Sequence, residues 1–144
     1  MINFLILLIK QQTNMIDFFC IFSTGGLILW FKQFATFNVD LINLLIRNIL
    51  MDEKRNQDYY TVDGIVMRWK VVNDKGLIFT AAYQQSYGEV YVDVLLDMVE
   101  KDFIATYHSQ IKKIGKVYVE CPNFTDRYLE ILDRWEKICK EKIT

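Results

Sequence analysis

The stretch "MIDFFCIFSTGGLILWF", Met15 to Phe31, lies near the N-terminus and is apolar almost throughout. As a helix it would rise about 26 Å, short of the roughly 30 Å hydrocarbon core of a bilayer. It also carries Asp17 and a central Ser-Thr-Gly-Gly run, residues that suit a turn better than a membrane-spanning helix. The stretch therefore predicts two short strands, Phe18–Phe22 and Leu27–Phe31, joined by a tight turn whose glycines allow positive φ.

A cleaved signal peptide is a poor alternative for this segment. No Lys or Arg precedes Lys10, and no small-x-small cleavage site follows the first apolar run. Both predicted strands are apolar at consecutive rather than alternate positions, so we expect both faces of each strand to be covered.

The composition is that of one globular domain. The chain has 144 residues, of which 52% are hydrophobic and 24% charged, enough for a single core. A net charge of −1 provides no field that would attract nucleic acid or an anionic membrane surface. The three cysteines and one histidine lack the spacing of a zinc site, and reduced, packed thiols fit them better than a disulfide framework.

The rest of the chain predicts further strands and helices in the order ββαβββαα. Because hairpins dominate this order, we expect an α+β fold with a five-stranded antiparallel sheet flanked by helices on both faces, as in profilin-like domains. Asp52–Tyr60 is expected to be a charged loop. The helices are predicted at Val39–Met51, at Tyr91–Tyr107 and after Asn123, and the remaining strands at Ile65–Val72, Leu77–Tyr83 and Tyr87–Val90.

The motifs of catalysis are missing from this pattern. His108 follows a predicted helix end, where a solvated histidine is the simpler interpretation than a general base. The pair Gly25-Gly26 lacks the frame of a phosphate-binding loop, and no serine lies in a GxSxG motif. Asp126 and Glu130 fit an exposed helix face. We therefore expect this chain to hold no catalytic residue, no metal and no cofactor, and we do not expect it to be an enzyme.

Three motifs together resemble one known family. They are the Phe-Ser-x-Gly-Gly-Leu turn at Phe22–Leu27, the run Leu45-Ile46-Arg47, and Tyr91-Val92-Asp93. In this combination the chain resembles the SRX domain, the N-terminal domain of the signal recognition particle receptor alpha subunit, from Met15 to about Phe103. The resemblance implies a longin-like fold, which agrees with the element order above.

The resemblance also implies a partner. In that family the domain is a non-catalytic effector that binds the GTP-bound form of the receptor beta subunit, a small membrane-anchored GTPase. GTP and magnesium would then sit on the partner. The alpha subunit would be held on the cytosolic face of the endoplasmic reticulum membrane for co-translational protein targeting, with only indirect links to membrane and ribosome. The family's own GTPase module has no counterpart in this sequence.

A GTPase effector should offer a mainly apolar surface with a few hydrogen-bonding groups. The predicted turn permits close backbone approach, and one side of the first helix combines polar anchors with an apolar residue outside its core-facing arc. The simpler interpretations are hairpin geometry for the turn and a surface ion pair for the arginine. The partner-binding residues predicted here are Ser23, Thr24, Gly25, Gly26, Asn43, Leu44 and Arg47.

Two other functions share this expected fold. One is a different longin-domain subunit of vesicle trafficking, of the SNARE or tethering-complex type. The other is a small-molecule sensor or enzyme built on a profilin-like or PAS-like sheet, which would need an internal pocket with converging polar groups.

Residues 1–14 have no counterpart in the resemblance and are expected to be an N-terminal extension, either disordered or not native, before a single domain at 15–144. We expect their deletion to leave binding of the GTPase partner intact. The dissociation constants of the two forms measure this, and a large loss of affinity on deletion would refute it.

Overall fold

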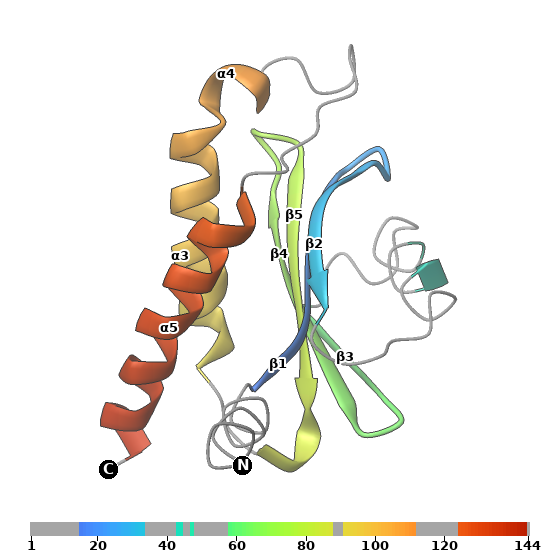
Figure 1. The fold of residues 1–144 in the computed structure, drawn as a ribbon. Helices are drawn as coiled ribbons and strands as arrows, with labels where there is room; N and C mark the ends of the chain where they lie inside the picture. The colour runs from blue at the N-terminus through green and yellow to red at the C-terminus, as the bar shows by residue number, and fades with distance from the viewer. Residues whose placement is uncertain are drawn as a thin grey trace, which may run out of the picture.

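The computed structural model describes residues 15–33, 43, 44, 47, 58–87, 91–111 and 124–143. Its centre is a five-stranded antiparallel sheet with the strand order β2-β1-β5-β4-β3 (Figure 1). The strands are β1 (Ile16–Ser23), β2 (Ile28–Gln33), β3 (Tyr59–Val62), β4 (Ile65–Val72) and β5 (Leu77–Gln84). The helices are the 3-10 helix η1 (Gln85–Tyr87), α3 (Val92–Thr106), α4 (His108–Ile111) and α5 (Phe124–Ile143).

Strand β1 is buried along all eight of its residues. Its neighbours β2 and β5 pair with it on either side, so backbone groups on both edges of the strand are used. One face of β1 contributes Ile16, Phe19 and Ile21 to the larger core, and the other contributes Phe18, Cys20 and Phe22 to a smaller one. The expectation that this strand is covered on both faces is confirmed.

Helices α3 and α5 lie side by side on one face of the sheet (Figure 1). In the first of them, predicted at Tyr91–Tyr107, the apolar residues Val92, Leu95, Leu96, Val99 and Phe103 are all buried. In the last helix, predicted to follow Asn123, the apolar series Phe124, Tyr128, Leu132, Trp135 and Cys139 is buried as well. Both helices follow a 3.6-residue period, and the apolar stripe of each faces the sheet.

Aromatic rings join α5 to the β1–β2 hairpin. Trp30 of β2 lies 5.1 Å from Phe124 and 4.9 Å from Tyr128, measured between ring centroids. Its indole Nε1–H donates to the Thr125 hydroxyl over 3.1 Å. Since buried aromatic pairs add to the free energy of burial, these contacts attach the edge of the sheet firmly to the last helix.

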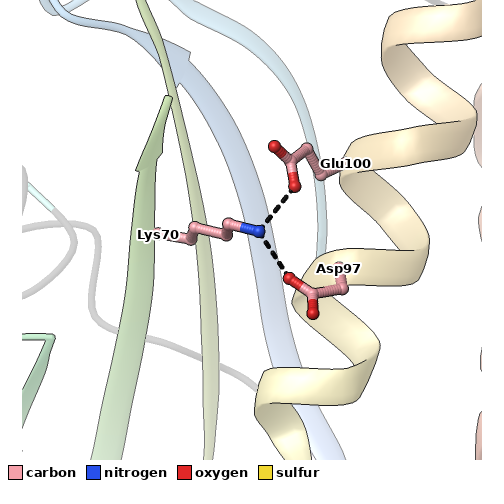
Figure 2. Close-up of polar contacts among 3 residues, drawn as sticks. All are labelled: Lys70, Asp97 and Glu100. Atoms are coloured by element: carbon pink, nitrogen blue, oxygen red, sulfur yellow. Dashed lines mark hydrogen bonds and ion pairs between the residues drawn. The ribbon is translucent and has the colours of Figure 1, made fainter. Parts of the chain in front are cut away.

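Ion pairs connect α3 to its neighbours at the rim of the core. The Lys70 ammonium of β4 reaches the carboxylates of Asp97 and Glu100, the latter at 2.7 Å, and these hydrogen bonds raise the pKa of Lys70 (Figure 2). The Arg127 guanidinium of α5 donates one hydrogen bond to each carboxylate oxygen of Asp102, at 2.7 and 3.1 Å. These groups are partly exposed, so they orient the helices more than they stabilise the fold.

The opposite face of the sheet carries the smaller core. Its buried side chains include Phe18, Cys20, Met67 and Trp69, all from strands. Burial raises the pKa of the Cys20 thiol to about 12, consistent with the packed, reduced cysteine expected from the sequence.

Two expectations from the sequence are wrong. The remaining strand of the sheet is Tyr59–Val62, which begins within the segment expected to be a charged loop and extends two residues beyond it. Tyr87 belongs to a 3-10 helix, and the other residues of the expected strand Tyr87–Val90 lie outside the described residues. This strand forms by pairing with β4, and its four residues are too few for the sequence pattern alone to identify it. The second strand is also not covered on both faces, since Ile28 and Phe31 are 36% and 53% exposed. It is the terminal strand of the sheet, where cover on one face ends.

The two environments of phenylalanine predict different costs of truncation. Phe19→Ala should lower the free energy of unfolding by about 3–5 kcal/mol, because Phe19 is fully buried between Trp30 and Tyr128. The matched variant Phe31→Ala should cost about 1 kcal/mol or less, since half of that side chain is already in water. Urea denaturation of both variants measures the difference, and equal losses would contradict the exposed placement of Phe31.

Candidate functional site

The turn between β1 and β2 is closed by hydrogen bonds of Ser23. Its backbone N–H donates to the Leu27 carbonyl at 2.8 Å, and its carbonyl accepts from the Gly26 N–H at 2.9 Å. Its hydroxyl accepts from the Leu27 N–H at 3.0 Å. Ser23 is itself buried, so its role is to hold the turn together. Of the other predicted turn residues, Thr24 is half-buried and Gly25 and Gly26 are exposed.

A second turn supports the first. The Thr24 N–H donates to the carbonyl of Gly76 over 3.0 Å, which ties the β1–β2 turn to the β4–β5 turn. Gly76 ends the Asn-Asp-Lys-Gly run between the two strands and has φ of +65°, a conformation that suits the glycine of a hairpin turn. The exposed backbone at residues 24–26 is therefore held in one conformation by a neighbouring hairpin.

The two glycines of the turn have different roles. Gly26 has φ of +93°, a conformation that side chains with a Cβ rarely adopt. A Cβ added at Gly25 would meet only the Ser23 hydroxyl, at an ordinary 3.7 Å. Gly26 is thus required for the turn, whereas Gly25 is exposed and has room for a side chain.

The predicted residues of the first helix are exposed. Asn43, Leu44 and Arg47 are helical and solvent-accessible, and 49% of Leu44 is exposed. The rest of the predicted helix Val39–Met51 lies outside the described residues.

Sequence reasoning missed two exposed apolar residues beside the turn. Ile28 and Phe31 lie on β2, opposite Phe22 and Cys20 of β1, and therefore on the face of the smaller core. Their exposure depends on the position of β2 at the sheet edge. No local signal in the sequence distinguishes a terminal strand from a central one when both are apolar.

The polar side chains that line the groove beside α4 do not form a recognisable catalytic set. An open groove of about 240 Å³ is lined by Asp74, Lys75, His108 and two isoleucines. His108 is exposed on the short helix α4, as the sequence suggested. Within the described ranges there is no group of three or more His, Cys, Asp or Glu side chains placed to hold a metal ion. In the same ranges, no helix combines the length and hydropathy needed to cross a membrane.

The fold is similar to solved SRX structures. One is the signal recognition particle receptor SRb-GTP/SRX complex from Chaetomium thermophilum, with a TM-score of 0.68, 28% identity, and coverage of 83% of this chain and 97% of that chain. Another is the mammalian SRP receptor, with a TM-score of 0.60, 29% identity, and coverage of 86% and 97%. The fold therefore defines an α+β domain of the SRX type.

The family is shown by the sequence comparison. The family model for "Signal recognition particle, alpha subunit, N-terminal" matches residues 40–140, and the chain belongs to this family. The match starts after the Ser23–Gly26 turn and extends through most of α5, beyond the Met15–Phe103 segment that carries the resemblance. Membership in this family gives no support to the alternative of another longin-type trafficking subunit.

Curated relatives agree with this assignment. The chain is 34% identical over 100 residues to signal recognition particle receptor subunit alpha of Mus musculus and of Homo sapiens, covering 69% of this chain. It is 30% identical over 132 residues to the Drosophila melanogaster homolog, covering 90% of this chain. The chain spans only 16% of the length of the mouse and human proteins and 20% of the fly protein.

The geometry of the turn predicts opposite outcomes for its two glycines. Gly26→Ala should lower the free energy of unfolding by about 1–2 kcal/mol, because alanine at φ of +93° is strained. Gly25→Ala should be neutral or stabilising by up to about 1 kcal/mol, since its backbone is compatible with alanine and the space is open. Thermal and urea unfolding of the pair measure this. Equal destabilisation by both substitutions would contradict the assigned roles.

Proposed function

We propose that this chain is the GTPase-binding domain of a signal recognition particle receptor alpha subunit and that it binds the GTP-bound beta subunit. The observation that carries the proposal is the structural match to the SRX chain of an SRb-GTP/SRX complex, which covers 97% of that chain at 28% identity. Because the match extends over nearly the whole of that chain, the similarity is one of complete domains rather than of a single shared motif.

The surface of this chain is compatible with such a role. Exposed backbone at the turn, an exposed leucine at position 44 and the cation of Arg47 provide the mixture of apolar and hydrogen-bonding groups found in effector interfaces. Ser23 contributes indirectly by shaping the turn, and Thr24, Gly25, Gly26 and Asn43 complete the proposed contact residues.

Binding of a membrane-anchored GTPase would place the chain at the cytosolic face of the endoplasmic reticulum. GTP and magnesium would belong to the beta subunit, and this domain would act without catalysis of its own. Its contribution would be a difference in affinity between the two nucleotide states of the partner, because a ligand shifts an equilibrium only by its differential affinity for the two states.

Nucleotide-dependent capture tests this function. The chain is immobilised and offered the soluble part of its cognate beta subunit, loaded with a non-hydrolysable GTP analogue or with GDP. We expect at least about tenfold tighter binding of the GTP form, within the usual range of such couplings. Equal affinity for both forms, or no binding, would overturn the proposal.

Charge reversal tests the helical group within the same assay. Arg47→Glu should weaken binding of the GTP-loaded beta subunit about tenfold, because the exposed cation would become a repulsive anion at the contact. The thermal midpoint should change little, since Arg47 is exposed. The control is Arg134→Glu, an exposed arginine on α5, which should bind as the unmodified chain does. Wild-type affinity of Arg47→Glu would remove this helix from the interface.

A further inference from the structure

The β1–β2 turn, residues 23–27, is supported from outside its own hairpin. The pairing of β1 with β2 shifts register between Ile21 and Phe22, so the strands are paired irregularly just before the turn. The pairing of β1 with β5 is regular from Phe18 to Ser23, and Ser23 lies opposite Leu77. The position of the turn therefore depends on β5 and on the β4–β5 turn that leads into it.

The β4–β5 turn, Asn73 to Gly76, is closed by two hydrogen bonds of its own. The Lys75 N–H donates to the Val72 carbonyl at 3.1 Å. The Gly76 N–H donates to the Asn73 carbonyl at 3.2 Å. The next residue, Leu77, is fully buried. The Gly76 carbonyl is therefore held in place between a closed turn and a buried side chain.

One hydrogen bond joins the two turns. The Thr24 N–H donates to the Gly76 carbonyl at 3.0 Å. The two residues are also close in space, since a Cβ placed on Gly76 would lie 3.5 Å from the Thr24 hydroxyl. The donating peptide is planar, and a hydrogen bond is strong only when donor and acceptor are aligned. The Gly76 carbonyl therefore sets the orientation of the backbone that enters residues 24–26.

The direction of the Gly76 carbonyl depends on a conformation that glycine permits. Its φ is +65°, in the left-handed region where a residue with a Cβ is strained. An alanine Cβ would fit the space at ordinary contact distance, so its effect would act through the backbone rather than through a clash. A backbone that relaxes this strain rotates the peptide after residue 76 and turns its carbonyl away from Thr24.

We propose that Gly76 is a positioning residue whose carbonyl holds the backbone at residues 24–26 in the conformation that the GTP-bound beta subunit contacts. This inference rests on the proposed function and adds the β4–β5 turn to the part of the chain that determines it. Gly76 acts through the Thr24 peptide and needs no contact with the partner. A surface that is fixed before binding loses less conformational entropy when the partner docks, which is the physical gain from this hydrogen bond.

The turn between β3 and β4 provides a matched control. Its glycine, Gly64, has φ of +77°, and its carbonyl accepts a hydrogen bond from the Gln85 N–H at 2.8 Å. Among the described residues, a Cβ on Gly64 would meet no atom within 4 Å. Gly64 precedes the first residue of β4 and Gly76 follows its turn at the other end, so the two glycines lie at opposite ends of this strand. The same substitution at each applies the same backbone strain near to the proposed contact surface and far from it.

Alanine substitution at the two glycines tests the proposal. Gly76→Ala and Gly64→Ala should each lower the thermal midpoint by about 3–8 °C, because both place alanine in the left-handed region. Each variant is titrated with the soluble beta subunit loaded with a GTP analogue, at a temperature well below both midpoints. We expect Gly76→Ala to bind about three- to tenfold more weakly and Gly64→Ala to bind as the unmodified chain does. Gly76→Asn should retain binding, since asparagine tolerates positive φ.

Amide hydrogen exchange of the free chain measures the hydrogen bond itself. In Gly76→Ala the Thr24 amide should exchange at least about tenfold faster than in the unmodified chain, because its acceptor has moved. In Gly64→Ala the Gln85 amide should exchange faster instead, and the Thr24 amide should not change.

The outcomes separate this inference from the proposed function. If the unmodified chain fails to bind the beta subunit, the proposed function fails and the inference fails with it. If the chain binds, but Gly76→Ala has lost protection at Thr24 and still binds with unchanged affinity, the positioning role is refuted and the proposed function stands. Equal weakening by both alanine variants would assign the loss to lower stability and refute the role as well. Unchanged exchange of the Thr24 amide in Gly76→Ala would also overturn it, because the turn would then not depend on Gly76.

Discussion

The complete burial of β1 is the constraint on which the rest of this structure depends. Its eight residues are covered on both faces, and strands β2 and β5 pair with both of its edges. A shift of one residue in its register would exchange Phe19 with Phe18 or Cys20 and so mix the two cores. The Ser23 turn on one side and the pairing with β5 on the other therefore have to be correct together.

The two cores built on β1 are covered by different means. On one face, α3 and α5 bring aromatic rings into contact with Trp30 and Phe19 and are oriented by the ion pairs of Lys70 and Arg127. That cover extends to β2 through Trp30 but leaves the other face of β2 open at Phe31. Since an apolar side chain at the end of a core gains free energy only when something covers it, the open end of the smaller core favours association there.

Much of this fold could be predicted from the sequence, because several elements carry long periodic patterns. The inward series of α3 and α5 and the Gly-Gly turn follow from spacing and glycine chemistry alone. Strand β3 and the exposure of Phe31 could not be predicted, because both depend on which strands are neighbours in the sheet. The partner-binding residues stay a prediction: Gly25 and Arg47 are exposed, whereas Ser23 is buried within the turn that it stabilises.

Recognition by this domain would depend on a surface that is rigid before binding. The Trp30 indole is hydrogen-bonded to Thr125, and Gly26 holds the turn in a left-handed conformation, so the turn and the strand beside it are fixed. A rigid surface binds tightly only to a partner that is already in the matching shape. Any preference for GTP over GDP would therefore arise from a change of shape in the GTPase.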